Sequence, residues 1–170
     1  SRLPGGQPNF VKLPALSPAE QWRETQDCTP AFVWRQTEMI MTALANCPAS
    51  FYNDELDSAK FTLDESRVTL IKLMYRDVGV YFAKRYKHFS TLLTPECLHD
   101  LRSTYLRPGA EPVDPAALAE ATLQTYAMLG KYLARLSQRY GGGFEPAWYA
   151  LLLQRVQAML AAVIHPASAP

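Results

Sequence analysis

Residues 114–143, DPAALAEATLQTYAMLGKYLARLSQRYGGG, contain the start, the body and the end of one long helix. Asp114 before Pro115 is a start signal, because the aspartate accepts from free amides of the first turn and proline fits the first helical position. Glycines at 141–143 end the helix, since glycine adopts the left-handed backbone that other residues resist. Apolar residues of this stretch share one face and polar residues the other, as in an amphipathic helix. The apolar face holds Leu118, Tyr126, Leu129, Tyr132, Leu133, Leu136 and Tyr140, and the polar face holds Glu120, Gln124, Lys131, Arg135 and Gln138.

Similar start signals recur along the chain. Ser17, Thr29 and Thr94 each precede a proline, and residues 62–65 have the pattern of a capping box. Residues 53–60 are acidic and weakly patterned, so we expect a loop or short turn there. The sequence therefore predicts an all-α fold, an irregular bundle of about six helices. The expected helices are residues 17–27, 30–46, 63–88, 95–106, 115–140 and 146–164.

The last of these helices, residues 146–164, has almost no polar face. Such a helix belongs either at the centre of a bundle or in a membrane. Three polar residues near its middle, among them Arg155, and a length barely sufficient to span disfavour the membrane. We therefore expect residues 146–164 to form the central helix of the bundle.

The composition is that of an ordinary globular protein, with 170 residues, 48% hydrophobic and 19% charged. We expect an extended segment at 1–16, one helical domain at 17–165 and a tail at 166–170. The formal net charge of +1 gives the molecule no overall field for nucleic acid or an anionic membrane. Three widely spaced cysteines and no signal peptide favour a reducing compartment, either cytoplasm or nucleus, over secretion. The Pro/Ala/Ser-rich ends suggest a domain excised from a larger intracellular protein.

Motifs for catalysis, nucleotides and metals do not stand out. We find no GxGxxG, Walker or HExxH pattern, and Cys97 and His99 are too close in one helix to face each other. We therefore expect no enzymatic activity, no cofactor and no metal. His88 leaves a globin-like, cofactor-binding domain as a minor alternative, although a partly buried histidine at a helix end is the favoured interpretation.

The outer face of the expected helix 63–88 combines a basic edge with Leu73 and Val80, seven residues apart among polar neighbours. A neighbouring segment that covers the two apolar residues is the favoured explanation, and a stripe that docks a partner is the sharper one. The candidate partner-binding residues are Leu73, Arg76, Val80, Lys84, Arg85 and Lys87.

Residues 81–89 interleave basic and aromatic side chains, as contacts to single-stranded nucleic acid do. Helical projection turns Phe82 and Tyr86 toward the core, so this composition favours an ordinary solvated face over an RNA or single-stranded DNA site. An acidic protein surface fits the same basic edge.

The function we expect is therefore non-catalytic protein–protein interaction, as in an adaptor or scaffold module. Three tryptophans and nine tyrosines supply interface anchors. Nucleic-acid binding through residues 81–89 is the alternative. The sequence leaves open a homodimer, and it leaves open whether the helix around Trp22 packs on its own domain, which is favoured, or on a partner.

Overall fold

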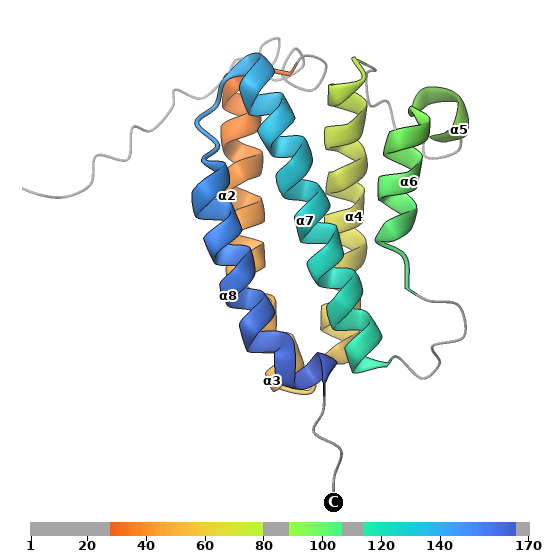
Figure 1. The fold of residues 1–170 in the computed structure, drawn as a ribbon, viewed down its shortest axis with the longest axis vertical. Helices are drawn as coiled ribbons and strands as arrows, with labels where there is room; N and C mark the ends of the chain where they lie inside the picture. The colour runs from red at the N-terminus through yellow and green to blue at the C-terminus, as the bar shows by residue number, and fades with distance from the viewer. Residues whose placement is uncertain (1–27, 80–88, 107–113, 166–170) are drawn as a thin grey trace, which may run out of the picture.

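The computed structural model describes residues 28–79, 89–106 and 114–165. They form seven helical segments and no strand (Figure 1). The all-α class predicted from the sequence is confirmed. The segments are α2 (Pro30–Asn46), α3 (Pro48–Tyr52), α4 (Leu56–Asp77), α5 (Phe89–Leu92), α6 (Pro95–Ser103), α7 (Pro115–Tyr140) and α8 (Pro146–Ile164).

Three of the predicted helix starts are confirmed in atomic detail. The side chains of Thr29, Thr94 and Asp114 each accept a hydrogen bond from a backbone N–H of the first turn of α2, α6 and α7, at 3.0 to 3.2 Å. Gly141 follows the last residue of α7 with a φ of +82°, which is the left-handed stop that the sequence predicts. The expected helix at 17–27 lies outside the described residues.

The start of α4 differs from the prediction. The helix begins at Leu56, within the segment expected to be a loop, because Ala59 and Leu63 continue its apolar spacing and are both buried. The apparent capping box therefore lies inside the helix, where Asp64 pairs with Lys60 one turn earlier at 3.4 Å. Residues 80–88 of the expected helix lie outside the described residues.

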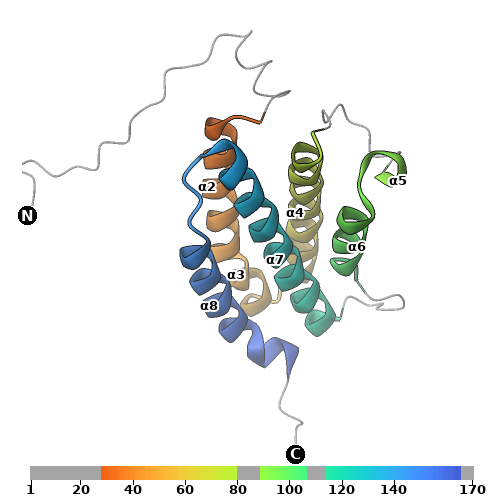
Figure 2. The same cartoon turned by 45° about the horizontal axis from the view of Figure 1, so that its top comes forward.

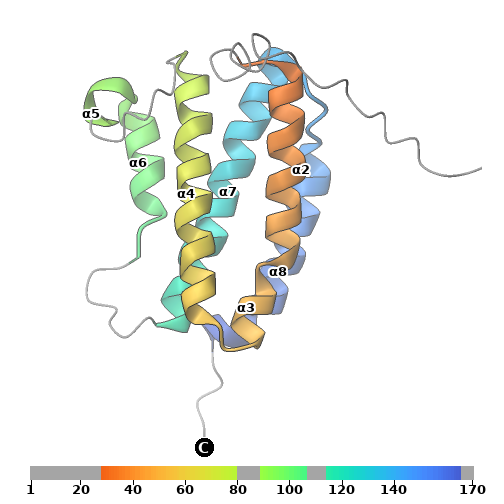
Figure 3. The same cartoon turned by 180° about the vertical axis from the view of Figure 1, so that it is seen from behind.

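The centre of the bundle is α7. It packs against α2, α4, α6 and α8, and Figures 1 and 2 show it between α8 and α4. Seen from behind in Figure 3, α2 and α4 flank it. Small residues let neighbouring helices approach from several sides. The buried residues of α7 are Leu118, Ala119, Ala121, Thr122, Thr125, Tyr126, Leu129, Gly130, Tyr132, Leu133 and Leu136.

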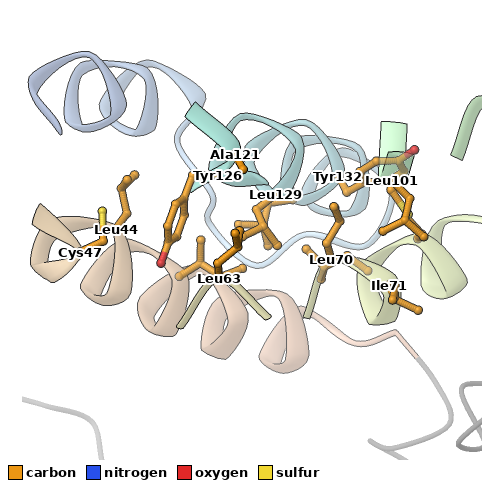
Figure 4. Packing of buried hydrophobic residues seen from close by; sticks show 14 of the residues in the cluster. Leu44, Cys47, Leu63, Leu70, Ile71, Leu101, Ala121, Tyr126, Leu129 and Tyr132 are labelled. Carbon is orange, nitrogen blue, oxygen red and sulfur yellow. The ribbon is translucent and has the colours of Figure 1, made fainter. Parts of the chain in front are cut away.

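Polar side chains inside α7 are satisfied within the fold. The hydroxyls of Thr122 and Thr125 donate to backbone carbonyls four residues earlier, at 2.8 and 2.7 Å. Figure 4 shows Tyr126 of α7 pointing toward the residues of the neighbouring helices, and its hydroxyl is 3.4 Å from that of Ser66 in α4. A helix with several polar residues is thus able to occupy the core, because none of these hydroxyls is left without a partner.

The prediction that α8 occupies the centre is wrong, although α8 does pack against the other helices. It lies at the edge of the bundle, against α7, α2 and α3 (Figures 1 and 2). Only 17% of the residues along its apolar stretch are fully buried. These are Tyr149, Val156 and Leu160, which share one narrow face, and Leu152, Leu153, Val163 and Ile164 are half-buried against the core. The side of the helix that carries Trp148, Leu151 and Met159 faces outward.

Candidate interaction surface

A network of ion pairs joins α6 to α7 and to the end of α4. The ammonium of Lys131 lies 2.9 Å from Glu96 and 2.6 Å from Asp100. The guanidinium of Arg135 pairs with Glu96 and, at 3.2 Å, with Asp77. The contacts cover the polar face of α7 with the carboxylates of α6, so they hold α6 in place.

The electrostatics of this network favour a structural role. The hydrogen bond from Arg135, then that from Lys131, lowers the pKa of Glu96 to about 2. The hydrogen bond to Glu96 in turn raises the pKa of Arg135. Burial, and then the neighbouring Cys97 and Asp100, raise the pKa of Tyr132, whose hydroxyl donates to Asp100 at 2.9 Å. Glu96 and Tyr132 thus keep their protonation states through the neutral range, which does not suit proton transfer.

A polar cavity of about 320 Å³ opens beside this network. Asp77, Arg135, Gln138 and Arg139 line it. Arg139 donates to the backbone carbonyl of Asp77 at 2.6 Å and approaches its carboxylate at 3.4 Å. Both arginines therefore already bind the carboxylate that lies between them, so the cavity offers little charge to a further ligand.

A second, smaller cavity of about 110 Å³ lies between α2 and α4, above α7. Thr62, Ser66, Thr69 and Tyr126 contribute hydroxyls to its lining, and Glu65 is the one charged residue among the described residues that line it. Burial raises the pKa of Tyr126 to about 12, so this phenol stays protonated. Sites for small molecules usually measure roughly 300–1,000 Å³, well above the volume found here.

The cysteines lie in surroundings that suppress their reactivity. Burial raises the pKa of Cys47 to about 12 and that of Cys28 to about 11. The thiolate, which is the nucleophile, is therefore scarce at neutral pH. Among the described residues, no three His, Cys, Asp or Glu side chains lie close enough together to hold a metal ion.

The most distinctive surface is the exposed side of α8. Trp148, Leu151 and Met159 are 69%, 59% and 41% exposed. We define the α8 outer face as the exposed residues Trp148, Leu151, Arg155, Ala158, Met159 and Ala162. Arg155 is the one charged residue of α8. A soluble protein seldom leaves such large apolar side chains together in water unless another surface covers them.

Two neighbouring helices extend this apolar surface. Tyr52 of α3 is 58% exposed, and its hydroxyl donates to the backbone carbonyl of Met159. Trp34 of α2 is 44% exposed, and its ring lies against Gly143, just before α8 begins. Exposed aromatic side chains thus lie beside Met159 of the α8 outer face and beside the turn that leads into α8.

The orientation of α8 is fixed by its buried side. The hydroxyl of Tyr149 donates to the backbone carbonyl of Tyr126 in α7 at 2.7 Å. The ring of Tyr149 lies on Gly130, where an added Cβ would be 2.4 Å from a ring carbon. Phe144 packs beside the same ring, at 5.4 Å between centroids. These contacts direct the α8 outer face away from the bundle.

The partner-binding residues predicted from the sequence are not found on this surface. Leu73 is fully buried in the core, so a neighbouring segment covers it, as the favoured explanation had it. Arg76 is only 7% exposed, and its guanidinium lies 4.7 Å from the centre of the Phe32 ring. The prediction that these two residues face a partner is corrected. Val80, Lys84, Arg85 and Lys87 lie outside the described residues.

The alternatives that rested on residues 81–89 are left with a single described residue. Phe89 is half-buried and packs against the core. His88, on which the globin-like alternative depended, also lies outside the described residues. His99 and His165 are exposed.

Sequence reasoning missed the α8 outer face because it assigned the whole apolar surface of residues 146–164 to the core. Among the described helices, α8 is the one long and apolar enough to cross a membrane by length and composition. A signal for the exposed face was present in the positions of Trp148, Leu151 and Arg155, which lie on one side of the helix. No family model, curated protein or solved structure matches this chain.

Proposed function

We propose that this chain is a protein-interaction module whose binding surface is the α8 outer face. The observation that carries the proposal is the exposure of Trp148, Leu151 and Met159 on a helix that is otherwise firmly packed. Burying apolar surface yields roughly 25 cal/mol per Å², and the centres of interfaces are rich in tryptophan and methionine. A protein partner would remove this surface from water.

Protein fits this surface better than lipid does. Arg155 lies midway along the α8 outer face, and an arginine at the centre of a bilayer costs about 3 kcal/mol even on the more lenient scales. Membrane insertion would also separate Tyr149 from its hydrogen-bond acceptor in α7. The rim of a protein interface, in contrast, readily accepts a guanidinium.

A site-specific crosslinking experiment tests this function. A photo-reactive amino acid is placed at Ala158, within the α8 outer face, and in a second sample at Phe61, which is 64% exposed on α4. We expect a defined protein adduct from position 158 and not from position 61. Excess unlabelled wild-type chain should compete with this adduct, and Leu151→Lys should abolish it.

Equal crosslinking from both positions would show that the α8 outer face has no special affinity, and the function would be rejected. Circular dichroism of each variant establishes that the helices are retained. The mass of the adduct also identifies the partner, because a second copy of the chain doubles the mass and any other protein changes it differently.

A further inference from the structure

We infer that the α8 outer face binds a second copy of this chain, with the two α8 helices antiparallel. The inference rests on the proposed function, since it assigns a partner to the same surface. Three features of the described residues support it: their spacing, the order of large and small side chains, and the position of the one charge.

The spacing of the face is that of a helix-pairing seam. Trp148, Leu151, Arg155, Ala158 and Ala162 follow one another at intervals of three, four, three and four residues. This alternation keeps one stripe of a helix facing a partner helix, as positions a and d do in a coiled coil. All five residues are exposed, so the stripe is accessible.

The size of the side chains changes along this seam. The first half carries Trp148 and Leu151, and the second half carries Ala158 and Ala162. An antiparallel second copy sets the large half of each helix against the small half of the other. Trp148 occupies an a position of the seam and Ala158 occupies a d position. In an antiparallel pair each a position faces a d position of the partner, so Trp148 contacts the partner's Ala158. A parallel pair would instead bring two tryptophans together and leave the alanines without contacts.

The single charge favours the same direction. The antiparallel register sets Arg155 over the partner's Leu151, one turn from the partner's Trp148. A guanidinium stacks well on an indole ring, while its aliphatic stem covers apolar surface. A parallel pair places Arg155 against the partner's Arg155, and α8 has no carboxylate to offset the repulsion.

The size of the surface sets the strength of the dimer. A stable interface usually takes roughly 20 residues from each side, more than one helix face supplies. Trp34 and Tyr52 enlarge the patch without doubling it. We therefore expect a weak dimer, with a Kd in the micromolar range.

Sedimentation velocity of the full chain over a series of concentrations tests the dimer. We expect the wild type to pass from monomer to dimer as its concentration rises through about 10 µM. Leu151→Lys should stay monomeric, with at least a tenfold rise in Kd, because it sets a second cation against the partner's Arg155. The matched control is Phe61→Lys, at an exposed apolar residue on α4, which should dimerise like the wild type.

A size-swap experiment tests the antiparallel direction. Ala158→Trp should weaken the dimer, because two tryptophans would then compete for one site. The double variant Trp148→Ala with Ala158→Trp restores one large and one small residue at each contact and should recover the dimer. Ala161→Trp, an exposed position to one side of the seam, serves as the control. If the double variant is no better than Ala158→Trp alone, the antiparallel register is wrong.

The remaining outcomes separate this inference from the proposed function. A wild type that stays monomeric while position 158 crosslinks to a different protein overturns the second copy and leaves the function standing. A dimer that Leu151→Lys does not affect places the interface elsewhere and overturns the inference. Co-sedimentation of the wild type with phosphatidylcholine vesicles, lost in Leu151→Lys, would assign the face to a lipid surface and overturn both.

Discussion

The ring of Tyr149 in α8 lies on the backbone of Gly130 in α7, and its hydroxyl donates to the Tyr126 carbonyl at 2.7 Å. An added Cβ at Gly130 would be 2.4 Å from a carbon of that ring, closer than real atoms approach. The absence of a side chain at Gly130 therefore decides how closely α8 approaches α7. It also decides which side of α8 faces outward.

Gly130→Ala should therefore destabilise the protein. Overpacking costs about 1–3 kcal/mol and is offset in part by the gain of about 1 kcal/mol that alanine brings to a helix interior. Because an approach of 2.4 Å is a severe clash, we expect a cost toward the upper end and a net loss of up to about 2 kcal/mol in the free energy of unfolding, measured with urea. In a Tyr149→Ala background the clash is absent, so the same substitution should stabilise the protein by up to about 1 kcal/mol. If Gly130→Ala destabilised the wild type and the Tyr149→Ala variant equally, a clash with the Tyr149 ring would not be the cause.

Arg135→Met should loosen α6 from the bundle. The substitution removes the ion pair with Glu96 of α6, and it leaves Asp77 of α4, whose side chain is 9% exposed, without its contact at 3.2 Å. We expect a loss of about 1–2 kcal/mol, below the value for a fully buried pair because Arg135 is itself about one-third exposed. Lys60→Met is the control, since its pair with Asp64 is exposed and worth at most about 0.5 kcal/mol. The rate of amide hydrogen exchange in α6 should rise in Arg135→Met and stay unchanged in Lys60→Met.

The pH dependence of stability should change in Glu96→Gln. Arg135 and Lys131 lower the pKa of Glu96 from 4.5 to about 2 in the folded protein. A lowered folded pKa means that the ion pairs stabilise the protein fully above pH 4.5 and are lost as the pH falls toward 2. The gap in urea midpoint between wild type and Glu96→Gln should therefore be constant from pH 7 to 5 and shrink below. A gap that widens in acid would refute the assignment.

The Cys47 thiol should resist alkylation in the native protein. Burial raises its pKa to about 12, so little thiolate forms at pH 8 and reagents reach the sulfur only when the structure opens. We expect iodoacetamide to label Cys47 much more slowly than Cys28, which is half-buried, and both to react rapidly in urea. Peptide mass spectrometry follows each site. The pH dependence of stability has the opposite direction to that of Glu96. Because burial raises the pKa of Cys47 in the folded protein, the stabilisation from the protonated thiol is lost as the pH rises toward 12.

Local signals predicted the helices well where a cap or a stop is written in consecutive residues. Thr29, Thr94 and Asp114 start helices as expected, and Gly141 ends one, because each acts on amides or on a backbone angle within a few residues. The capping-box pattern around Asp64 misled for the same reason. A short pattern cannot reveal that Leu56, half-buried against the core, and Ala59, which is buried, extend the helix upstream.

The functional surface was less predictable. The residue pattern predicted it on the helix from 63 to 88, where Leu73 and Arg76 are buried within the bundle. Helical projection gives the angle of each side chain around its own axis, and it does not say which sides of that axis the neighbours cover. The α4 and α8 helices each pack against three other helices of the described residues, and these neighbours cover Leu73 and Arg76 of α4 but leave the outer face of α8 exposed.

By itself, the sequence determined the all-α class, the bounds of α7 and α8 and the apolar character of α8. These properties depend on hydrogen bonds and backbone angles close in the chain, or on the side chains of one helix. Only the tertiary structure decided that α7 occupies the centre and α8 the edge. Carboxylates of α6 cover the polar side of α7, and Gly130 admits the ring of Tyr149, so the more polar helix became buried. Apolar residues make exposure to water costly, but which surface covers them depends on shape and on partners, and for α8 the described residues leave its outer face uncovered.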